Sequence, residues 1–278
     1  MLDIDAVLSS KPISPSREMG AYEALWANKK ATFKTIADCF RNQPEMVPSE
    51  IVSEQAINEA LSKVNELISL SRVRDFGIQV YGSRDYPERL RDAAHPIQVL
   101  YYRGHWDIID APKRIAVVGS RSVSEEGIRR TRKLVKLLVQ DGYTIVSGLA
   151  KGVDTAAHTT AIENGGSTIA VIGTPITEYY PRENKALQDL IAEKFLLLSQ
   201  VPIWRYATQD YRSNRLFFPE RNATMSAVAQ ATVIVEASDT SGTLAQARAA
   251  LQQGRRLFIL DNCFRDPRLT WQIGRAHV

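Results

Sequence analysis

The sequence contains little cysteine and no long apolar run, and each absence restricts what the protein can be. Its two cysteines, Cys39 and Cys263, are too few for a disulfide framework or a cysteine-based metal site, so we expect reduced thiols and no bound metal. No apolar run approaches the roughly 20 residues of a membrane span. The N-terminus reads MLDIDAVLSS, which lacks the basic region of a secretory signal. We therefore expect a cytoplasmic protein that does not contact membranes.

A strong charge of either sign is also lacking. The 278 residues are 44% hydrophobic and 24% charged, which is typical of a globular protein, and the formal net charge is +4. This length is enough for one large domain or two modest ones. The small positive excess permits an anionic partner such as a nucleic acid but does not require one.

The two common phosphate-binding loops are absent as well. Residues 114–118 are apolar and β-branched, which predicts a buried strand, and Gly119-Ser120-Arg121 follows. The next glycine is Gly127, so the segment has neither the dinucleotide fingerprint nor a Walker A loop. In their place is a compact loop with one cation, and an arginine there can hold a phosphate through two hydrogen bonds. The alternative is a tight turn with a solvated arginine, and this segment alone does not decide between them.

Strand and helix patterns alternate from residue 114 onward. This alternation predicts an α/β fold with a mostly parallel, doubly wound sheet that carries helices on both faces. The expected strands are 77–81, 99–102, 114–118, 143–146, 168–172, 195–198, 232–235 and 256–260. The expected helices of this region are 127–141, 153–163, 183–194, 223–229 and 243–253.

The chain is expected to have three parts and a short tail. They are a helical module at 1–73, a lead-in segment at 74–112 that packs on the main domain, the main domain at 113–271, and residues 272–278. Residues 273–278 match one reading frame of a common sequencing adapter, so we interpret 272–278 as a non-native tail.

The N-terminal module is predicted to contain two main helices. One covers residues 20–41, and the other begins near Glu50 with Ser49 as its N-cap. Nothing in this module carries recognisable chemistry. Trp26 and Cys39 are therefore expected to be core residues.

Four loops rich in small residues follow the predicted strands or precede the last helix. They are 119–121, 147–158, 173–184 and 236–243. In a doubly wound sheet such loops converge at the carboxyl edge. We expect their free backbone N–H groups, with Arg121 and Lys151, to form one anion-binding concavity.

Several residues in and near these loops allow two interpretations. Asp154 and His158 share a helix face and could form a base and its orienting group, although a cap and a packed histidine are favoured. Phe217 and Phe218 could stack on bases or lie in the core. Arg221 could contact a phosphate or a core carboxylate, and Asn222 could cap a helix or read a base edge.

The helix at 127–141 is very basic, but we expect its cations to form a solvated outer face. They are interleaved with apolar positions that pack on the sheet, and they lie away from the helix N-terminus. They are Arg129, Arg130, Arg132, Lys133 and Lys136.

Taken together, the loop motifs resemble those of the DNA-processing protein A (DprA/Smf) family. The motifs, in chain order, are GSR at Gly119–Arg121, SGLAKGVDTAAH at Ser147–His158, YPREN at Tyr180–Asn184, FPERN at Phe218–Asn222 and SGTLAQA at Ser241–Ala247. The resemblance covers about Arg74 to Asp261. It implies an extended Rossmann-like domain that binds and protects single-stranded DNA and helps load a RecA-type recombinase during natural transformation. It implies no cofactor and no catalytic residue, and it allows a homodimer.

The same resemblance implies a set of DNA contacts. They come from Gly119, Ser120, Arg121, Ser147, Gly148, Lys151, Arg221 and Asn222. The converging loops add three residues to the phosphate-binding set, namely Ser241, Gly242 and Thr243. One departure from the family pattern is Ala223, which stands where members usually have another arginine.

Two alternative functions remain open at this stage. One is an enzyme or sensor for a small nucleotide, related to the lysine-decarboxylase-like phosphoribohydrolases. The loop after Gly242-Thr243 continues with Leu244, Ala245 and Gln246, without a carboxylate that could assist glycosidic cleavage, and this favours a binding protein. The other alternative is a DprA relative that works in a defence system.

Overall fold

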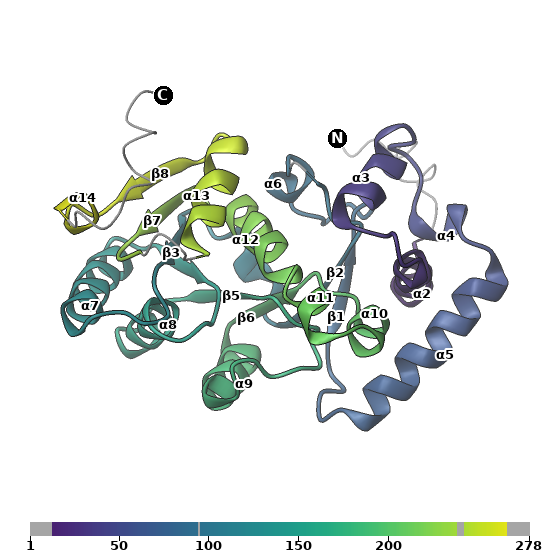
Figure 1. The fold of residues 1–278 in the computed structure, drawn as a ribbon, viewed down its shortest axis with the longest axis horizontal. Coiled ribbons are helices and arrows are strands. Elements are labelled where there is room, and N and C mark those ends of the chain that lie inside the picture. Colours follow the sequence, from purple (N-terminus) through teal and green to yellow (C-terminus); the bar gives the residue numbers. More distant parts are fainter. Residues whose placement is uncertain (1–12, 94, 238–241, 266–278) are drawn as a thin grey trace, which may run out of the picture.

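A computed structural model describes residues 13–93, 95–237 and 242–265, and an eight-stranded sheet runs through it (Figure 1). The strand order is β1-β2-β6-β5-β4-β3-β7-β8. Strands β3 to β8 are parallel, whereas β2 pairs antiparallel with both β1 and β6. The strands are β1 Gly77–Val80, β2 Val99–Gly104, β3 Arg114–Val118, β4 Thr144–Ser147, β5 Thr168–Ile172, β6 Leu196–Ser199, β7 Ala231–Ile234 and β8 Arg256–Ile259.

Helices cover both faces of the sheet, which confirms the predicted doubly wound, Rossmann-like fold. One face packs against α7 (Glu125–Gln140), α8 (Val153–Glu163) and α9 (Lys185–Lys194), and the other against α12 (Phe217–Val228) and α13 (Thr243–Gln252). Strands β3 to β7 are buried throughout because both of their faces are covered. The apolar runs that predicted these strands are a direct result of this double burial.

The chain reverses its direction of winding at β3. It proceeds from β3 through β4 and β5 to β6, and then crosses back to place β7 and β8 on the other side of β3. The loops that leave β3 and β7 therefore diverge at the carboxyl edge of the sheet. Such a topological switch point leaves a crevice where ligands bind in open α/β folds.

The single helix expected over 20–41 is wrong, because the structure has two helices there. They are α2 (Pro15–Ala27) and α3 (Phe33–Arg41). Thr32 caps α3 by accepting a hydrogen bond from the backbone of Thr35, and the Thr35 hydroxyl accepts one in return from the backbone of Thr32. This local capping interrupts the apolar periodicity that had suggested one helix.

The expected N-cap at Ser49 is also wrong. Ser49 lies inside the short helix α4 (Pro48–Ile51), and its backbone N–H and its hydroxyl both donate to the carboxylate of Glu18. The long helix α5 (Glu54–Leu70) begins after Ser53, whose hydroxyl accepts a hydrogen bond from the Ala56 N–H. Cys39 is exposed rather than part of the core.

Helix α12 begins six residues earlier than predicted, so the FPERN motif lies within it rather than before it. Pro219 is tolerated there because backbone N–H groups in the first turn of a helix have no acceptor within the helix, so the missing N–H of proline costs no hydrogen bond.

The remaining elements are short. They are α6 Glu88–Arg91, η1 Trp106–Asp110, η2 Arg182–Asn184, α10 Ile203–Thr208, α11 Tyr211–Asn214 and α14 Asn262–Arg265.

The N-terminal helices dock at the β1 end of the sheet, beside α10 (Figure 1). One hydrophobic cluster joins Met19 of α2, Tyr101 of β2 and Ala170 of β5. Trp26 is a core residue, as expected, and its ring centroid lies 4.7 Å from that of Phe33 and 5.8 Å from that of Phe217. The division at residues 73 and 112 stays a prediction, and residues 272–278 lie outside the described ranges.

A buried carboxylate fixes this docking. Glu23 of α2 has no exposed surface, and its carboxylate accepts hydrogen bonds from the Tyr101 hydroxyl (2.5 Å) and from the backbone N–H groups of Ile203 (2.8 Å) and Trp204 (3.0 Å). Burial raises the pKa of Glu23 to about 7.

No helix within the described ranges is long and apolar enough to cross a membrane.

The raised pKa makes Glu23 a pH-dependent element of stability. Between the ordinary pKa of 4.5 and about 7, the folded state holds a proton that the unfolded state has released, so stability falls as pH rises through this window. Glu23→Gln removes this titration. We compare the free energy of unfolding of the wild type with that of Glu23→Gln at each pH. The wild-type value minus the variant value should fall by at most about 3 kcal/mol as the pH rises from 4.5 to about 7. Denaturant titrations at several pH values measure this difference, and parallel pH profiles for the two proteins would contradict the assignment.

Candidate functional site

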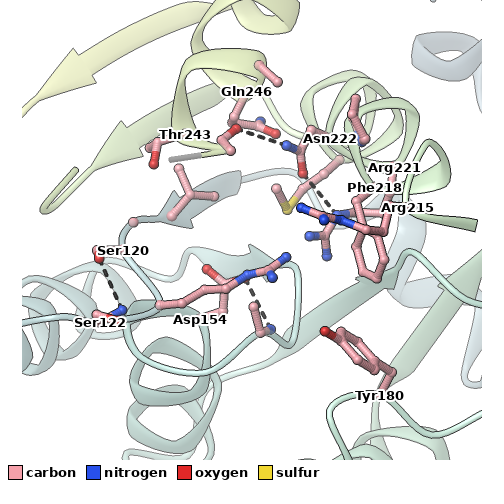
Figure 2. Close-up of a pocket in the computed structure, with 18 of the residues that line it drawn as sticks. Ser120, Ser122, Asp154, Tyr180, Arg215, Phe218, Arg221, Asn222, Thr243 and Gln246 are labelled. Carbon is pink, nitrogen blue, oxygen red and sulfur yellow. Dashed lines mark hydrogen bonds between the residues drawn. The ribbon is translucent and has the colours of Figure 1, made fainter. Parts of the chain in front are cut away.

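A cleft of about 690 Å³ lies at the carboxyl edge of the sheet, at the switch point beside β3 (Figure 2). Its walls come from the loop after β3, the start of α8, the segment through α11 and α12, and the start of α13. This position confirms that the predicted loops converge. The lining residues are Val118–Ser122, Ala150, Asp154, Tyr180, Tyr211, Arg215, Phe218, Pro219, Arg221, Asn222, Met225, Gly242, Thr243, Ala245 and Gln246.

Arg221 is the buried cation of the cleft. Its guanidinium donates to the backbone carbonyls of Gly148 and Val171, the latter at 2.8 Å, and its Nε donates to the side chain of Asn222 at 3.0 Å. Burial lowers the pKa of Arg221 to about 10. The positive charge of Arg121 lowers this pKa further, whereas the negative charge of Asp154 raises it. Arg221 therefore stays charged at neutral pH. Arg221 lines the cleft and is influenced by the charge of Asp154, and its contact with a phosphate stays a prediction.

Arg121 is an exposed cation of the cleft, as is Arg215, and it lies beside an aromatic wall. Its guanidinium carbon is 5.6 Å from the ring centroid of Phe218, and the Phe218 and Tyr180 centroids are 5.4 Å apart. Phe218 is half-buried, whereas Phe217 lies in the core. Arg215 adds a third cation. The described lining residues include three arginines and one carboxylate, that of Asp154, so this surface carries a net charge of +2.

The loop after β3 is held by hydrogen bonds within the protein. The Ser120 N–H donates to the Glu236 carbonyl at 2.8 Å, and the Ser122 N–H donates to the Ser120 hydroxyl at 3.1 Å. A side chain at Gly119 would lie 2.5 Å from Val153, so the loop packs tightly against the start of α8. The expectation that free backbone N–H groups surround the cation is therefore wrong at Ser120 and Ser122, because both groups already have acceptors.

Three of the predicted site residues, Ser147, Gly148 and Lys151, do not line the cleft. Ser147 is fully buried and donates to the Val117 carbonyl at 2.7 Å, so it fixes the end of β4 and does not line the cleft. Lys151 is exposed, and its Nζ lies 2.6 Å from a carboxylate oxygen of Glu183. It lines a side hollow of about 150 Å³, together with Gly148, Arg121 and aromatic residues.

The amino end of α13 opens onto the cleft. Gly242 and Thr243 line it, and the Asn222 side-chain N–H donates to the Gly242 carbonyl at 3.1 Å (Figure 2). The N-terminus of a ten-residue helix carries partial positive charge and suits an anion. Ser241, the third predicted member of this group, lies outside the described residues.

Asp154 and His158 do not form a base and its orienting group. Asp154 accepts a hydrogen bond from the Ala150 N–H at 3.2 Å, and burial raises the pKa of its carboxyl while the charge of Arg221 lowers it. His158 is fully buried, with Nδ1 2.7 Å from the Thr168 hydroxyl, and burial lowers its pKa to about 3. The packed histidine is the favoured outcome, but the expected helix cap is wrong, because Asp154 accepts from the loop before α8 and the N-cap position is Gly152. Across the described ranges, no three His, Cys, Asp or Glu residues gather to hold a metal ion.

Sequence reasoning missed part of the lining. Tyr180 lay within a recognised motif but was given no role. Tyr211 and Arg215 lie at α11, which spans only four residues and so has no periodicity that could predict it. Gln246 is buried on α13, and its side-chain N–H donates to the Thr232 hydroxyl at 3.2 Å.

The chain is similar to known proteins over most of its length. A family model described as DNA recombination-mediator protein A matches residues 77–270. The DNA processing protein DprA of Streptococcus pneumoniae is 38% identical over 181 residues, which cover 65% of this chain and 61% of that relative's length. An X-ray structure of the S. pneumoniae protein aligns with a TM-score of 0.63 at 29% identity, covering 92% of this chain and 84% of that one.

A second solved structure has a similar fold. It is DNA processing protein A from Helicobacter pylori, described for its single-stranded DNA binding mode, with a TM-score of 0.58 and 26% identity. The alignment covers 68% of this chain and 82% of that chain. The range matched by the family model, residues 77–270, contains all eight strands of the sheet.

The contact between Gly148 and Arg221 can be tested by packing. A Cβ at Gly148 would lie 2.1 Å from a guanidinium nitrogen of Arg221, whereas a Cβ at Gly242 would meet nothing closer than 3.8 Å. We expect Gly148→Ala to lower the free energy of unfolding by about 1–3 kcal/mol through overpacking. The matched control Gly242→Ala should change it by less than about 0.5 kcal/mol. Denaturant midpoints measure both values, and equal losses would show that Arg221 does not constrain position 148.

Proposed function

Because this chain belongs to the DNA recombination-mediator protein A family, we propose that it binds single-stranded DNA in the cleft beside β3. The family relationship supports a DNA-binding recombination mediator rather than an enzyme. The H. pylori relative, described for its single-stranded DNA binding mode, supports the choice of single strands. Loading of a RecA-type recombinase and a role in natural transformation are part of the proposal and rest on the resemblance alone.

One observation carries the proposal, the pairing of an exposed cation with an aromatic surface in one cleft. Arg121 stands beside the half-buried ring of Phe218, with Tyr180 next to it. Proteins that bind single strands combine cations for the phosphates with aromatic rings on which bases stack. A duplex hides the faces of its bases, so this combination favours a single strand.

The cations of the cleft have different roles in this proposal. Arg121 is exposed and has no ion pair within the described residues, so it is available to a phosphate. Arg221 is fixed by two backbone carbonyls and acts mainly through its charge and by holding α12 in place. The amino end of α13 adds backbone donors on the opposite wall.

A catalytic role has little support in the same geometry. Cleavage of a glycosidic bond generally uses two carboxyl groups that flank the bond. Among the described residues that line the cleft, Asp154 is the one carboxylate, and it is 6% exposed and held by the Ala150 N–H. We therefore propose binding without turnover.

Arg121→Ala tests this function directly. Loss of a charge-assisted contact worth about 1.5–3 kcal/mol should weaken binding of a labelled single-stranded oligonucleotide roughly tenfold to hundredfold. The control is Arg129→Ala, which removes the same charge from the outer face of α7, where Arg129 pairs with Glu126. It should cost much less, through long-range attraction that salt screens.

The titrations are run at two salt concentrations, with unlabelled duplex as a competitor. Affinity should fall steeply with salt, and duplex should compete poorly. Equal losses for the two variants, or equal affinity for duplex, would contradict the placement of DNA in the cleft.

A further inference from the structure

Two smaller hollows adjoin the cleft in turn. The side hollow of about 150 Å³ shares Arg121, Tyr180 and Phe218 with the cleft. A third hollow, the α7–α8 groove, has a volume of about 430 Å³ and shares Lys151 with the side hollow. The shared residues place the three hollows in succession, from the switch point past Arg121 and Lys151 to residues of α7 and α8.

The α7–α8 groove has the composition of a nucleic-acid track. Its floor includes the small or apolar residues Ile128 and Ala156, and the hydroxyl of Thr159 lies on the next turn of α8. Arg132 is the cation that α7 contributes to its wall, and this side chain is exposed. Sugars and bases can pack on such a floor while a phosphate meets the cation.

The cations of α7 differ in their partners and in their position. Arg129 and Arg130 both pair with Glu126, whereas Arg132, like Lys133 and Lys136, has no ion pair among the residues described. Of the five cations of this helix, Arg132 is the one that lines the groove. The expected solvated outer face therefore contains one cation that is placed for a ligand.

We propose that the α7–α8 groove is a second subsite for the same DNA strand, with a backbone phosphate bound by Arg132. This inference rests on the proposed function of the cleft. A strand that fills the cleft leaves past Lys151 and lies along α7, so that Arg132 contacts only strands long enough to reach it.

The junction at Lys151 fits this path. Its ion pair with Glu183 is exposed on both sides, with side-chain exposures of 56% and 64%. Exposed ion pairs contribute little to stability, so a phosphate can replace Glu183 as the partner of Lys151 at small cost. Glu183 itself lines the groove, and its carboxylate would then turn toward solvent.

The test compares oligothymidylates from about 4 to about 20 nucleotides long, a range that spans typical single-strand site sizes. For the longest strands, Arg132→Ala should weaken binding several-fold and reduce the slope of log K against log salt by about 0.7, the value for one phosphate contact on a single strand. For the shortest strands it should change neither quantity. Arg129→Ala, which makes the same charge change on the same helix, is the matched control and should show no dependence on length.

The outcomes separate this inference from the proposed function. If Arg121→Ala weakens binding at every length but Arg132→Ala behaves like Arg129→Ala throughout, the groove is not a subsite and the cleft still stands. If Arg121→Ala has no effect, the cleft itself is wrong. Equal losses for Arg132→Ala on short and long strands would also overturn the subsite, because they would reflect long-range attraction alone.

Discussion

The site depends on one buried cation, the guanidinium of Arg221. It donates hydrogen bonds to the backbone carbonyls of Gly148, which follows β4, and Val171, which lies in β5, and so joins α12 to the middle of the sheet. Without these bonds the charge would be buried without partners, which is costly. The same bonds leave no room for a side chain at Gly148, and they place Phe218, three residues earlier on α12, at the cleft wall.

The two charges nearest Arg221 have opposite effects on its pKa. Asp154 balances one guanidinium, but Arg121 repels Arg221 and adds to the fall in its pKa. A phosphate between the cations would relieve this repulsion while the carbonyl bonds keep the site in shape. The cleft thus combines a backbone held by hydrogen bonds with an excess of positive charge, and the anion site that we propose rests on this combination. The N-terminal helices add to this rigidity, because Trp26 and Phe33 pack on Phe217, the residue next to Phe218.

The sequence predicted the sheet well and the side-chain roles less well. Strands β3 to β7 were predictable because double burial requires continuous apolar runs such as Ile115–Val118. The role of Ser147 was not predictable, since only the three-dimensional pairing of β3 and β4 brings the Val117 carbonyl to its hydroxyl. The partner of the Ser120 N–H, Glu236, is likewise distant in sequence. Arg215 was missed because α11 is too short to leave a periodic pattern.

The most direct test of the account is to map where a bound strand lies. A single-stranded oligonucleotide that carries a photoreactive uracil is crosslinked to the full chain, and the modified residues are identified by mass spectrometry. We predict adducts at Phe218 or Tyr180, because Phe218 lies beside Arg121 and Tyr180 lies next to Phe218. Adducts confined to the N-terminal helices or to the β8 edge, with none in the cleft, would contradict it.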